Sequence, residues 1–245
     1  MAYFNQIIGI KNEDKLINEF IKQFIKILDN KKKRFSFVLA GGNSPIKLYK
    51  KMSLNKEINW KKVDFFIGDE RYVGVNSKDS NFRMCNKNLL SKIKINKNQI
   101  FRINTNNNSI KIDTLNYQKI IKKYFYKKKI LFDLTLLGLG QDGHIASLFK
   151  KNINLKTKKV VSFINKKNIP RITITLPIIN SSKNIFLWAP GKKKINIIKK
   201  IYFDNKKIYP ASNLKPKEKL FLYSTVTDLA KFLGLSISKP FLRAE

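Results

Sequence analysis

The stretch LLGLGQDGHIASLF, residues 136–149, decides how this chain is organised. It continues an apolar run, Leu131 to Leu137, whose length and bounding glycine are typical of a buried strand. Glycines then allow a tight turn and the close approach of a ligand, and Asp142 is predicted to cap a helix that follows. His144, the only histidine, is therefore expected on a loop at the carboxyl end of a strand. Ligands of open α/β sheets bind at that edge.

Length and composition indicate a globular protein. The 245 residues are 43% hydrophobic, enough for one large α/β domain or two small ones. No apolar segment approaches the ~20 residues that span a bilayer. The first residues lack the basic and apolar segments of a signal peptide, and the single cysteine, Cys85, permits no internal disulfide. We expect a cytoplasmic protein.

The formal net charge of +35 admits two interpretations. One is a nucleic-acid or anionic-membrane partner. The other is compositional drift, because lysine, isoleucine and asparagine are abundant throughout, as an A/T-biased coding sequence favours. The basic residues recur along the whole chain rather than in one block, and 6 arginines stand among the 51 basic residues. We therefore predict no specific nucleic acid and no membrane partner, but attraction of an anionic substrate.

A second glycine turn, residues 41–45, follows the predicted strand 34–40. Ser44 before Pro45 is typical of a helix start, with a capping hydroxyl followed by proline at the first helical position. Free N–H groups and the helix dipole at such a turn bind anions. The sequence thus predicts a phosphate site here, although a plain strand–helix turn has the same pattern.

A third polar cluster, Gly68-Asp69-Glu70-Arg71, ends the predicted strand 63–67. It is either a solvated loop or a carboxylate and a guanidinium placed in a cleft.

The remaining pattern alternates short apolar runs with amphipathic helices. Because the runs are apolar on both faces, they favour an α/β fold with a mostly parallel sheet covered by helices on both faces. Further strands are predicted at 100–103, 160–164, 171–176, 184–189 and 220–223, and helices at 12–30, 81–90, 113–127, 192–202 and 227–233.

Five motifs, in this order, resemble the glucosamine-6-phosphate isomerase/6-phosphogluconolactonase superfamily, and within it the lactonase branch. They are Gly41-Gly42-Asn43-Ser44-Pro45, Gly68-Asp69-Glu70-Arg71 with Ser80-Asn81, the block 138–149, the strand 170–175, and Gly191 with Lys194. The deaminase/isomerase branch typically carries Asp-Glu-Tyr at 69–71 and Asn-Gly-His-Ile-x-Phe-Asn-Glu-Pro in the histidine block. The chain departs from the lactonase pattern at Asn43 and at Lys150-Lys151, where Pro-Gly is usual.

The resemblance implies a single-domain, three-layer Rossmann-like fold over residues 1–245. It implies hydrolysis of 6-phospho-D-glucono-1,5-lactone to 6-phospho-D-gluconate, the second step of the oxidative pentose phosphate pathway. His144 is the expected general base that activates water. Asp69 is expected to orient His144, the water or the sugar hydroxyls. Arg71 is expected to polarise the lactone carbonyl or to contact the phosphate.

The resemblance also assigns the phosphate-binding groups. The backbone of Gly41, Gly42, Asn43 and Ser44 is expected to hold the phosphate, with Arg171 and Lys194 neutralising it. Asp142 and Gly143 are expected to shape the histidine loop, and Ser147 to start a helix rather than to act as a nucleophile.

No metal and no cofactor is implied, and the expected state is a monomer or a weak homo-oligomer. Three alternatives stay open: a glucosamine-6-phosphate isomerase-like enzyme, a non-catalytic phosphosugar-binding protein, and a nucleic-acid-binding module suggested by charge alone.

Overall fold

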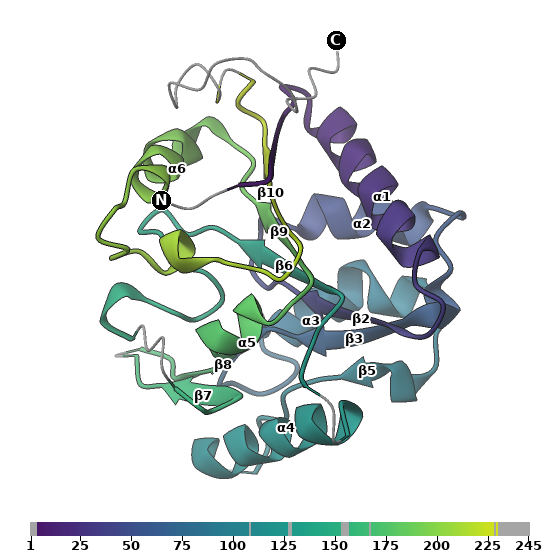
Figure 1. The fold of residues 1–245 in the computed structure, drawn as a ribbon. Coiled ribbons are helices and arrows are strands. Elements are labelled where there is room, and N and C mark those ends of the chain that lie inside the picture. Colours follow the sequence, from purple (N-terminus) through teal and green to yellow (C-terminus); the bar gives the residue numbers. More distant parts are fainter. Residues whose placement is uncertain are drawn as a thin grey trace.

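The structure is a computed structural model that describes residues 4–107, 109–126, 129–152, 157–166, 168–227 and 229. The described residues form an α/β fold in which a central sheet lies between helices, as predicted (Figure 1). The strands are β1 (Gln6–Gly9), β2 (Phe35–Leu39), β3 (Val63–Ile67), β4 (Asp69–Arg71), β5 (Ile100–Phe101), β6 (Leu134–Gly138), β7 (Val161–Ile164), β8 (Arg171–Ile174), β9 (Asn184–Trp188) and β10 (Lys219–Ser224). The α-helices are α1 (Glu13–Asp29), α2 (Ile46–Leu54), α3 (Asn81–Asn88), α4 (Ile110–Tyr124), α5 (Leu176–Asn180) and α6 (Ile195–Tyr202).

The central sheet contains seven strands in the order β1-β10-β9-β6-β2-β3-β5, and every neighbouring pair is parallel. All its carboxyl ends therefore lie at one edge. The loops that follow β2, β3 and β6 leave the sheet side by side, because these strands are neighbours in it. These are the three loops that the sequence singled out.

Helices cover both faces of this sheet, and the aromatic contacts show which helix covers which. Phe65 packs near Phe37 and Trp60 on the α1 side, whereas its neighbour Phe66 stacks on Phe101 and meets Tyr124 of α4. Successive residues of a strand point to opposite faces. Figure 1 accordingly shows α1 and α4 on opposite sides of the sheet.

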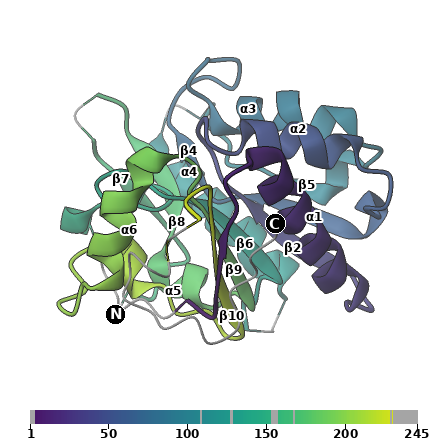
Figure 2. The same ribbon diagram turned by 90° about the horizontal axis from the view of Figure 1, so that it is seen from above.

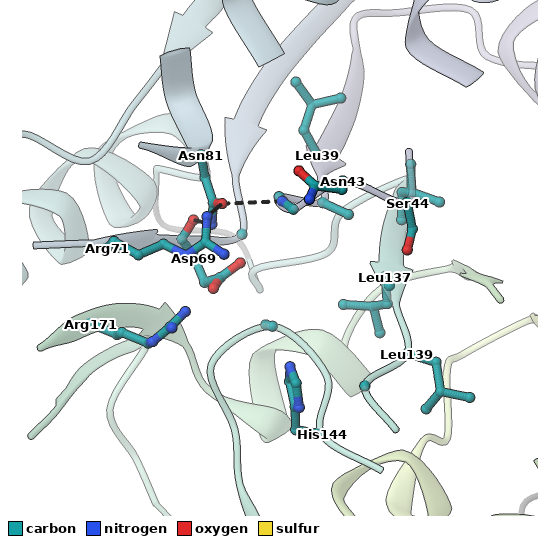
Figure 3. A pocket seen from close by; sticks show the side chains of 18 of the residues that line it. Leu39, Asn43, Ser44, Asp69, Arg71, Asn81, Leu137, Leu139, His144 and Arg171 are labelled. Carbon is teal, nitrogen blue, oxygen red and sulfur yellow. Dashed lines mark hydrogen bonds between the residues drawn. The ribbon is translucent and has the colours of Figure 1, made fainter. Parts of the chain in front are cut away.

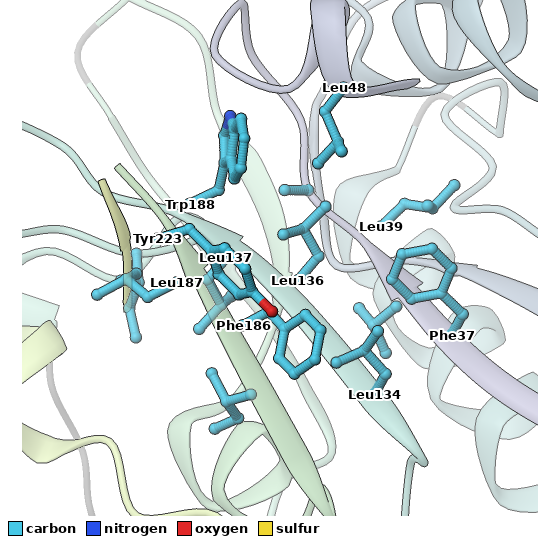
Figure 4. Packing of buried hydrophobic residues seen from close by; sticks show 14 of the residues in the cluster. Phe37, Leu39, Leu48, Leu134, Leu136, Leu137, Phe186, Leu187, Trp188 and Tyr223 are labelled. Carbon is cyan, nitrogen blue, oxygen red and sulfur yellow. The ribbon is translucent and has the colours of Figure 1, made fainter. Parts of the chain in front are cut away.

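Helix α1 forms because its apolar residues share one face. Asn12 caps it by accepting a hydrogen bond from the Lys15 N–H at 3.0 Å, as the sequence predicted. Its buried face packs over β9, β10 and β2, and Figure 4 shows part of the cluster beneath it, including Phe186, Trp188 and Tyr223.

A second sheet of three antiparallel strands, β4-β8-β7, was not predicted. Residues 69–71 are too polar to resemble a strand, yet they pair with β8 in the register Asp69–Thr173 and Arg71–Arg171. Figure 2 shows β7 and β8 across the central strands from α1 and α2. Backbone pairing, rather than β-propensity, makes β4 a strand.

The structure corrects several further predictions. Helix α2 begins at Ile46, with Pro45 at the N-cap and no side-chain cap from Ser44. Helix α4 begins three residues earlier than predicted and is capped by Ser109. Strand β1, in which only Ile7 and Ile8 are apolar, lies at the edge of the central sheet and was not predicted. The predicted closing helix 227–233 falls almost entirely outside the described residues.

The helix predicted directly after His144 does not form: residues 145–149 are not helical, and only a short 3-10 helix, Lys150–Asn152, follows them. Residues 145–148 instead form a tight turn in which the Leu148 N–H donates to the Ile145 carbonyl at 2.9 Å. Ala146 adopts a left-handed φ of 47° in this turn. Neither Asp142 nor Ser147 therefore has the helix-start role that was predicted.

We expect Phe20→Ala to lower the free energy of unfolding by about 3–5 kcal/mol, because it leaves a cavity in the core. The Phe20 side chain is fully buried and lies 5.1 to 5.8 Å, between ring centroids, from Phe186, Trp188 and Tyr223. Chemical denaturation measures the change. Phe203→Ala is the matched control, since Phe203 is 50% exposed, and equal losses in the two variants would contradict the packing described.

Candidate functional site

A pocket of about 220 Å³ opens at the carboxyl edge of the central sheet, where the loops after β2, β3 and β6 meet (Figure 3). Nine of the eleven residues predicted for the site line it, namely Gly41, Gly42, Asn43, Ser44, Asp69, Arg71, His144, Arg171 and Lys194. The other two, Asp142 and Gly143, belong to the histidine loop. Leu39, Leu136, Leu137, Leu139, Asn81 and Ala146 also contribute to the lining.

The His144 ring is held by its own loop. Its Nδ1 lies 2.5 Å from Oδ1 of Asp142, two residues earlier. A carboxylate accepts hydrogen bonds, so the neutral imidazole carries its proton on Nδ1 and leaves Nε2 as an acceptor. Figure 3 shows the ring directed into the pocket.

Two glycines make this arrangement possible. A Cβ on Gly140 would lie 2.1 Å from the Nδ1 atom of His144, so a larger residue would displace the ring. Gly143 has a φ of +80°, which favours glycine, and the ring of Tyr209 packs against it. The loop backbone is closed by the Gly140 N–H, which donates to the His144 carbonyl at 2.9 Å. The glycine spacing therefore fixes the position of the ring.

The pKa of Asp142 is lowered by this contact. Partial burial, the largest single effect, raises the pKa. The hydrogen bond from His144 and the charge of the imidazolium lower it, and together they outweigh the effect of burial. Asp142 therefore remains ionised throughout the range in which an imidazole titrates. Asp142 is thus the carboxylate that contacts the His144 ring, and of the three roles expected for Asp69, orienting His144 has no contact behind it among the described residues.

Arg71 and Arg171 lie directly opposite each other in the β4–β8 pair. Like charges in such a pair repel, and an anion between them relieves the repulsion. Burial lowers the pKa of Arg171, and the nearby charge of Arg71 lowers it further. The Nε atoms of both arginines are buried without a hydrogen-bond partner among the described residues. The pair has the chemistry of an anion site.

Asn81, at the start of α3, joins the separate parts of the pocket, and sequence reasoning missed this role. Its Oδ1 accepts from Nη1 of Arg71 at 2.5 Å and from the Gly42 N–H at 3.2 Å. Its Nδ2 donates to the Asp69 carbonyl at 2.7 Å. The signal in the sequence was its place in the second motif, beside Ser80, which was predicted as part of a cap and does cap α3.

Asn81 also limits what the glycine turn is free to bind. The Gly42 N–H is already used, which leaves those of Asn43 and Ser44 for an anion; neither has a hydrogen-bond partner among the described residues. Gly42 adopts a φ of +80°, and a Cβ on Gly41 would lie 2.0 Å from the Asn81 side chain. Glycine is therefore needed at Gly42 for its backbone conformation, and at Gly41 because the Asn81 side chain leaves no room for a Cβ.

Lys194 is the one residue of the run 192–194 that turns inward. Lys192 and Lys193 are exposed, whereas the Lys194 ammonium donates to the Leu139 carbonyl at 2.6 Å. Burial lowers the pKa of Lys194, and the charge of Asp142 partly opposes this shift. Lys194 therefore belongs to the pocket, whereas Lys192 and Lys193 are exposed to solvent.

Asp69 lies across the pocket from the histidine loop and is almost fully buried. Its Oδ2 accepts a hydrogen bond from the Ser147 hydroxyl at 2.6 Å. Figure 3 shows its carboxylate directed toward the middle of the pocket. The arrangement leaves Asp69 suited to contact a ligand there.

None of the helices in the described ranges is long and apolar enough to cross a membrane. Among those same residues, no three or more His, Cys, Asp or Glu side chains gather where they could hold a metal ion.

The fold and the pocket define an α/β protein whose ligand site, rich in cations, lies at the carboxyl edge of a parallel sheet. The chain belongs to the family of glucosamine-6-phosphate isomerases/6-phosphogluconolactonase, whose profile matches residues 11–223.

Relatives within the family carry the lactonase name. A 6-phosphogluconolactonase of Thermotoga maritima is 34% identical over 212 residues, which cover 84% of this chain and 90% of the relative. A 6-phosphogluconolactonase of Synechocystis is 32% identical over 191 residues, covering 76% of this chain and 79% of the relative.

Solved structures agree with the fold. The crystal structure of the Thermotoga maritima 6-phosphogluconolactonase superposes with a TM-score of 0.79 at 31% identity, covering 89% of this chain and 98% of that one. A monomeric glucosamine-6-phosphate deaminase superposes with a TM-score of 0.78 at 18% identity, covering 93% of this chain and 99% of that one. The fold alone therefore does not separate the two branches.

We expect Asp142→Ala to release the imidazole from the Nδ1–H tautomer. Because His144 is the only histidine, its ring gives one pair of ¹⁵N imidazole signals in NMR, without assignment ambiguity. The wild type should show a neutral ring protonated on Nδ1, and the variant a mixture or the other tautomer. An Nε2–H tautomer in the wild type would contradict the contact.

Proposed function

We propose that the protein hydrolyses 6-phospho-D-glucono-1,5-lactone to 6-phospho-D-gluconate. One observation carries the proposal above the others. The only imidazole of the chain enters a pocket that also contains Arg71, Arg171 and Lys194, and a carboxylate holds its far nitrogen. A neutral base beside several cations suits an ester of an anionic sugar phosphate.

In the proposed reaction, His144 Nε2 takes a proton from water as the water oxygen bonds to C1 of the lactone. The bond between C1 and the ring oxygen then breaks, and the imidazolium returns the proton to that oxygen. The products are a carboxylic acid at C1, which then loses its remaining proton to solvent to become a carboxylate, and a hydroxyl on the former ring oxygen. The carboxylate of Asp142 stabilises the imidazolium that forms between the two steps.

The phosphate is the only charged group of the lactone, and we assign it to the cationic side of the pocket. Arg171 reaches it with a planar guanidinium that matches two phosphate oxygens. The N–H groups of Asn43 and Ser44, the Ser44 hydroxyl and Lys194 complete the site. Arg71, held by Asn81, faces either the phosphate or the lactone carbonyl. Asp69 orients the water or the sugar hydroxyls.

This proposal includes three wider expectations. The enzyme works on a small-molecule substrate without a cofactor, in the cytoplasm, as one domain over residues 1–245. Its net charge of +35 raises the local concentration of the anionic lactone at low ionic strength.

We expect His144→Ala to lower kcat by about 10²–10⁴-fold, because the general base is lost. Disappearance of the lactone is measured at slightly acidic pH, where spontaneous hydrolysis is slow. Circular dichroism checks that the variant is folded. Equal rates above background for wild type and variant would remove His144 from the mechanism.

We expect Arg171→Lys and Lys194→Ala to raise KM for the phosphorylated lactone about tenfold, since each loses a charge-assisted contact with phosphate. Neither should alter the KM for the unphosphorylated glucono-1,5-lactone. Lys193→Ala is the matched control, because Lys193 is the exposed neighbour of Lys194. A similar rise in KM for both lactones would place these cations away from the phosphate.

A further inference from the structure

Ser147 belongs to the most distinctive motif of the chain, yet it does not line the pocket. Its side chain is fully buried, and its hydroxyl donates to Oδ2 of Asp69 at 2.6 Å. The hydroxyl has a single proton, and this contact uses it. Ser147 is therefore neither the helix-start residue predicted from the sequence nor a nucleophile available to a substrate.

The turn after His144 is shaped to make this contact. Ala146 adopts a left-handed φ of 47°, a conformation that is unfavourable for alanine because its Cβ approaches the following carbonyl oxygen. The strained residue turns the backbone so that Ser147 lies beneath β4. The Ser147 N–H also approaches Oγ1 of Thr173, at 3.4 Å, and Thr173 is the residue opposite Asp69 in the β4–β8 pair. The N–H and the hydroxyl of Ser147 thus contact the two residues that are paired in β4 and β8.

The contact leaves one oxygen of Asp69 for the pocket. Among the described residues, Oδ2 alone of the two carboxylate oxygens has a hydrogen-bond partner. A carboxylate with one oxygen tied cannot rotate freely, so the other oxygen is held toward the pocket. Without the Ser147 hydroxyl, the same buried carboxylate would have no hydrogen-bond partner among the described residues.

We infer that Ser147 is a positioning residue that fixes the Asp69 carboxylate for the reaction at His144. This inference rests on the proposed lactone hydrolysis. It gives the turn 145–148 a defined purpose, because one short segment then holds the elements on both sides of the pocket. His144, just before this turn, lines the pocket, and Ser147, within the turn, holds Asp69 through a hydrogen bond.

The test is a double-mutant cycle with Ser147→Ala, Asp69→Ala and the double variant. In the wild-type background, Ser147→Ala should lower kcat/KM about tenfold, mostly through kcat, as expected for a lost hydrogen bond to a charged group. In the Asp69→Ala background it should change kcat/KM less than twofold, because its target is gone. The dissociation constant for 6-phosphogluconate is measured for all four proteins and should show the same coupling.

Ser182→Ala is the matched control. Ser182 is also fully buried, and its hydroxyl shares a hydrogen bond of 2.8 Å with Thr135, away from the pocket. It should lose comparable stability in thermal unfolding but keep the wild-type kcat/KM.

The outcomes separate this inference from the proposed function. Additive effects of Ser147→Ala and Asp69→Ala, or an equal loss of kcat/KM in Ser182→Ala, would overturn the positioning role while the wild type still hydrolyses the lactone. A wild type that does not accelerate lactone hydrolysis would overturn the proposed function, and the positioning role with it.

Discussion

The antiparallel pairing of β4 with β8 is the interaction on which the site depends. The parallel sheet alone brings together three loops, but it supplies no residue from the far side of the pocket. By pairing with β8, the three residues after Gly68 become a strand, and Arg71 comes to lie opposite Arg171. The same register places Asp69 over Thr173, within reach of Ser147. One short ladder thus positions two cations and a carboxylate.

Placing Arg71 opposite Arg171 has an electrostatic cost, and the proposed binding of an anionic substrate accounts for it. Two guanidinium groups in neighbouring positions repel each other, and two buried Nε atoms are left without a protein partner among the described residues. Such features are uncommon in a structure optimised for stability alone, and they fit a site completed by an anionic ligand. Asn81 joins the parts of the site, since its single amide group contacts Arg71, the Gly42 N–H and the Asp69 carbonyl.

Much of the fold follows from the sequence because local patterns determine it. The face of α1 and its Asn12 cap were readable from spacing, and β2, β3, β6 and β9 were readable from short, mostly apolar runs. Strand β4 was not readable, because its residues are polar and become a strand only through a partner about a hundred residues later. The helix predicted after His144 fails for a related reason: contacts of Ser147 with Asp69 and Thr173 favour a turn over a helix.

The site likewise combines features that local sequence predicts with features that depend on contacts between distant segments. Glycine turns at strand ends located the loops, and the family motifs selected nine residues that do meet in one pocket. Asp142 was expected only to shape the histidine loop, and its contact with the His144 ring depends on the geometry of that loop, which the spacing of residues in the sequence does not determine. Asn81 and Ser147 both stand in family motifs, but they act through other residues, so the sequence did not reveal what they do.

A structure of the protein with 6-phosphogluconate bound tests the central claim most directly. The account predicts that the phosphate contacts Arg171 and the backbone of Asn43 and Ser44, and that the C1 carboxylate lies within hydrogen-bond distance of His144 Nε2. A ligand whose C1 points away from His144, or whose phosphate occupies the space beside the imidazole, would contradict it.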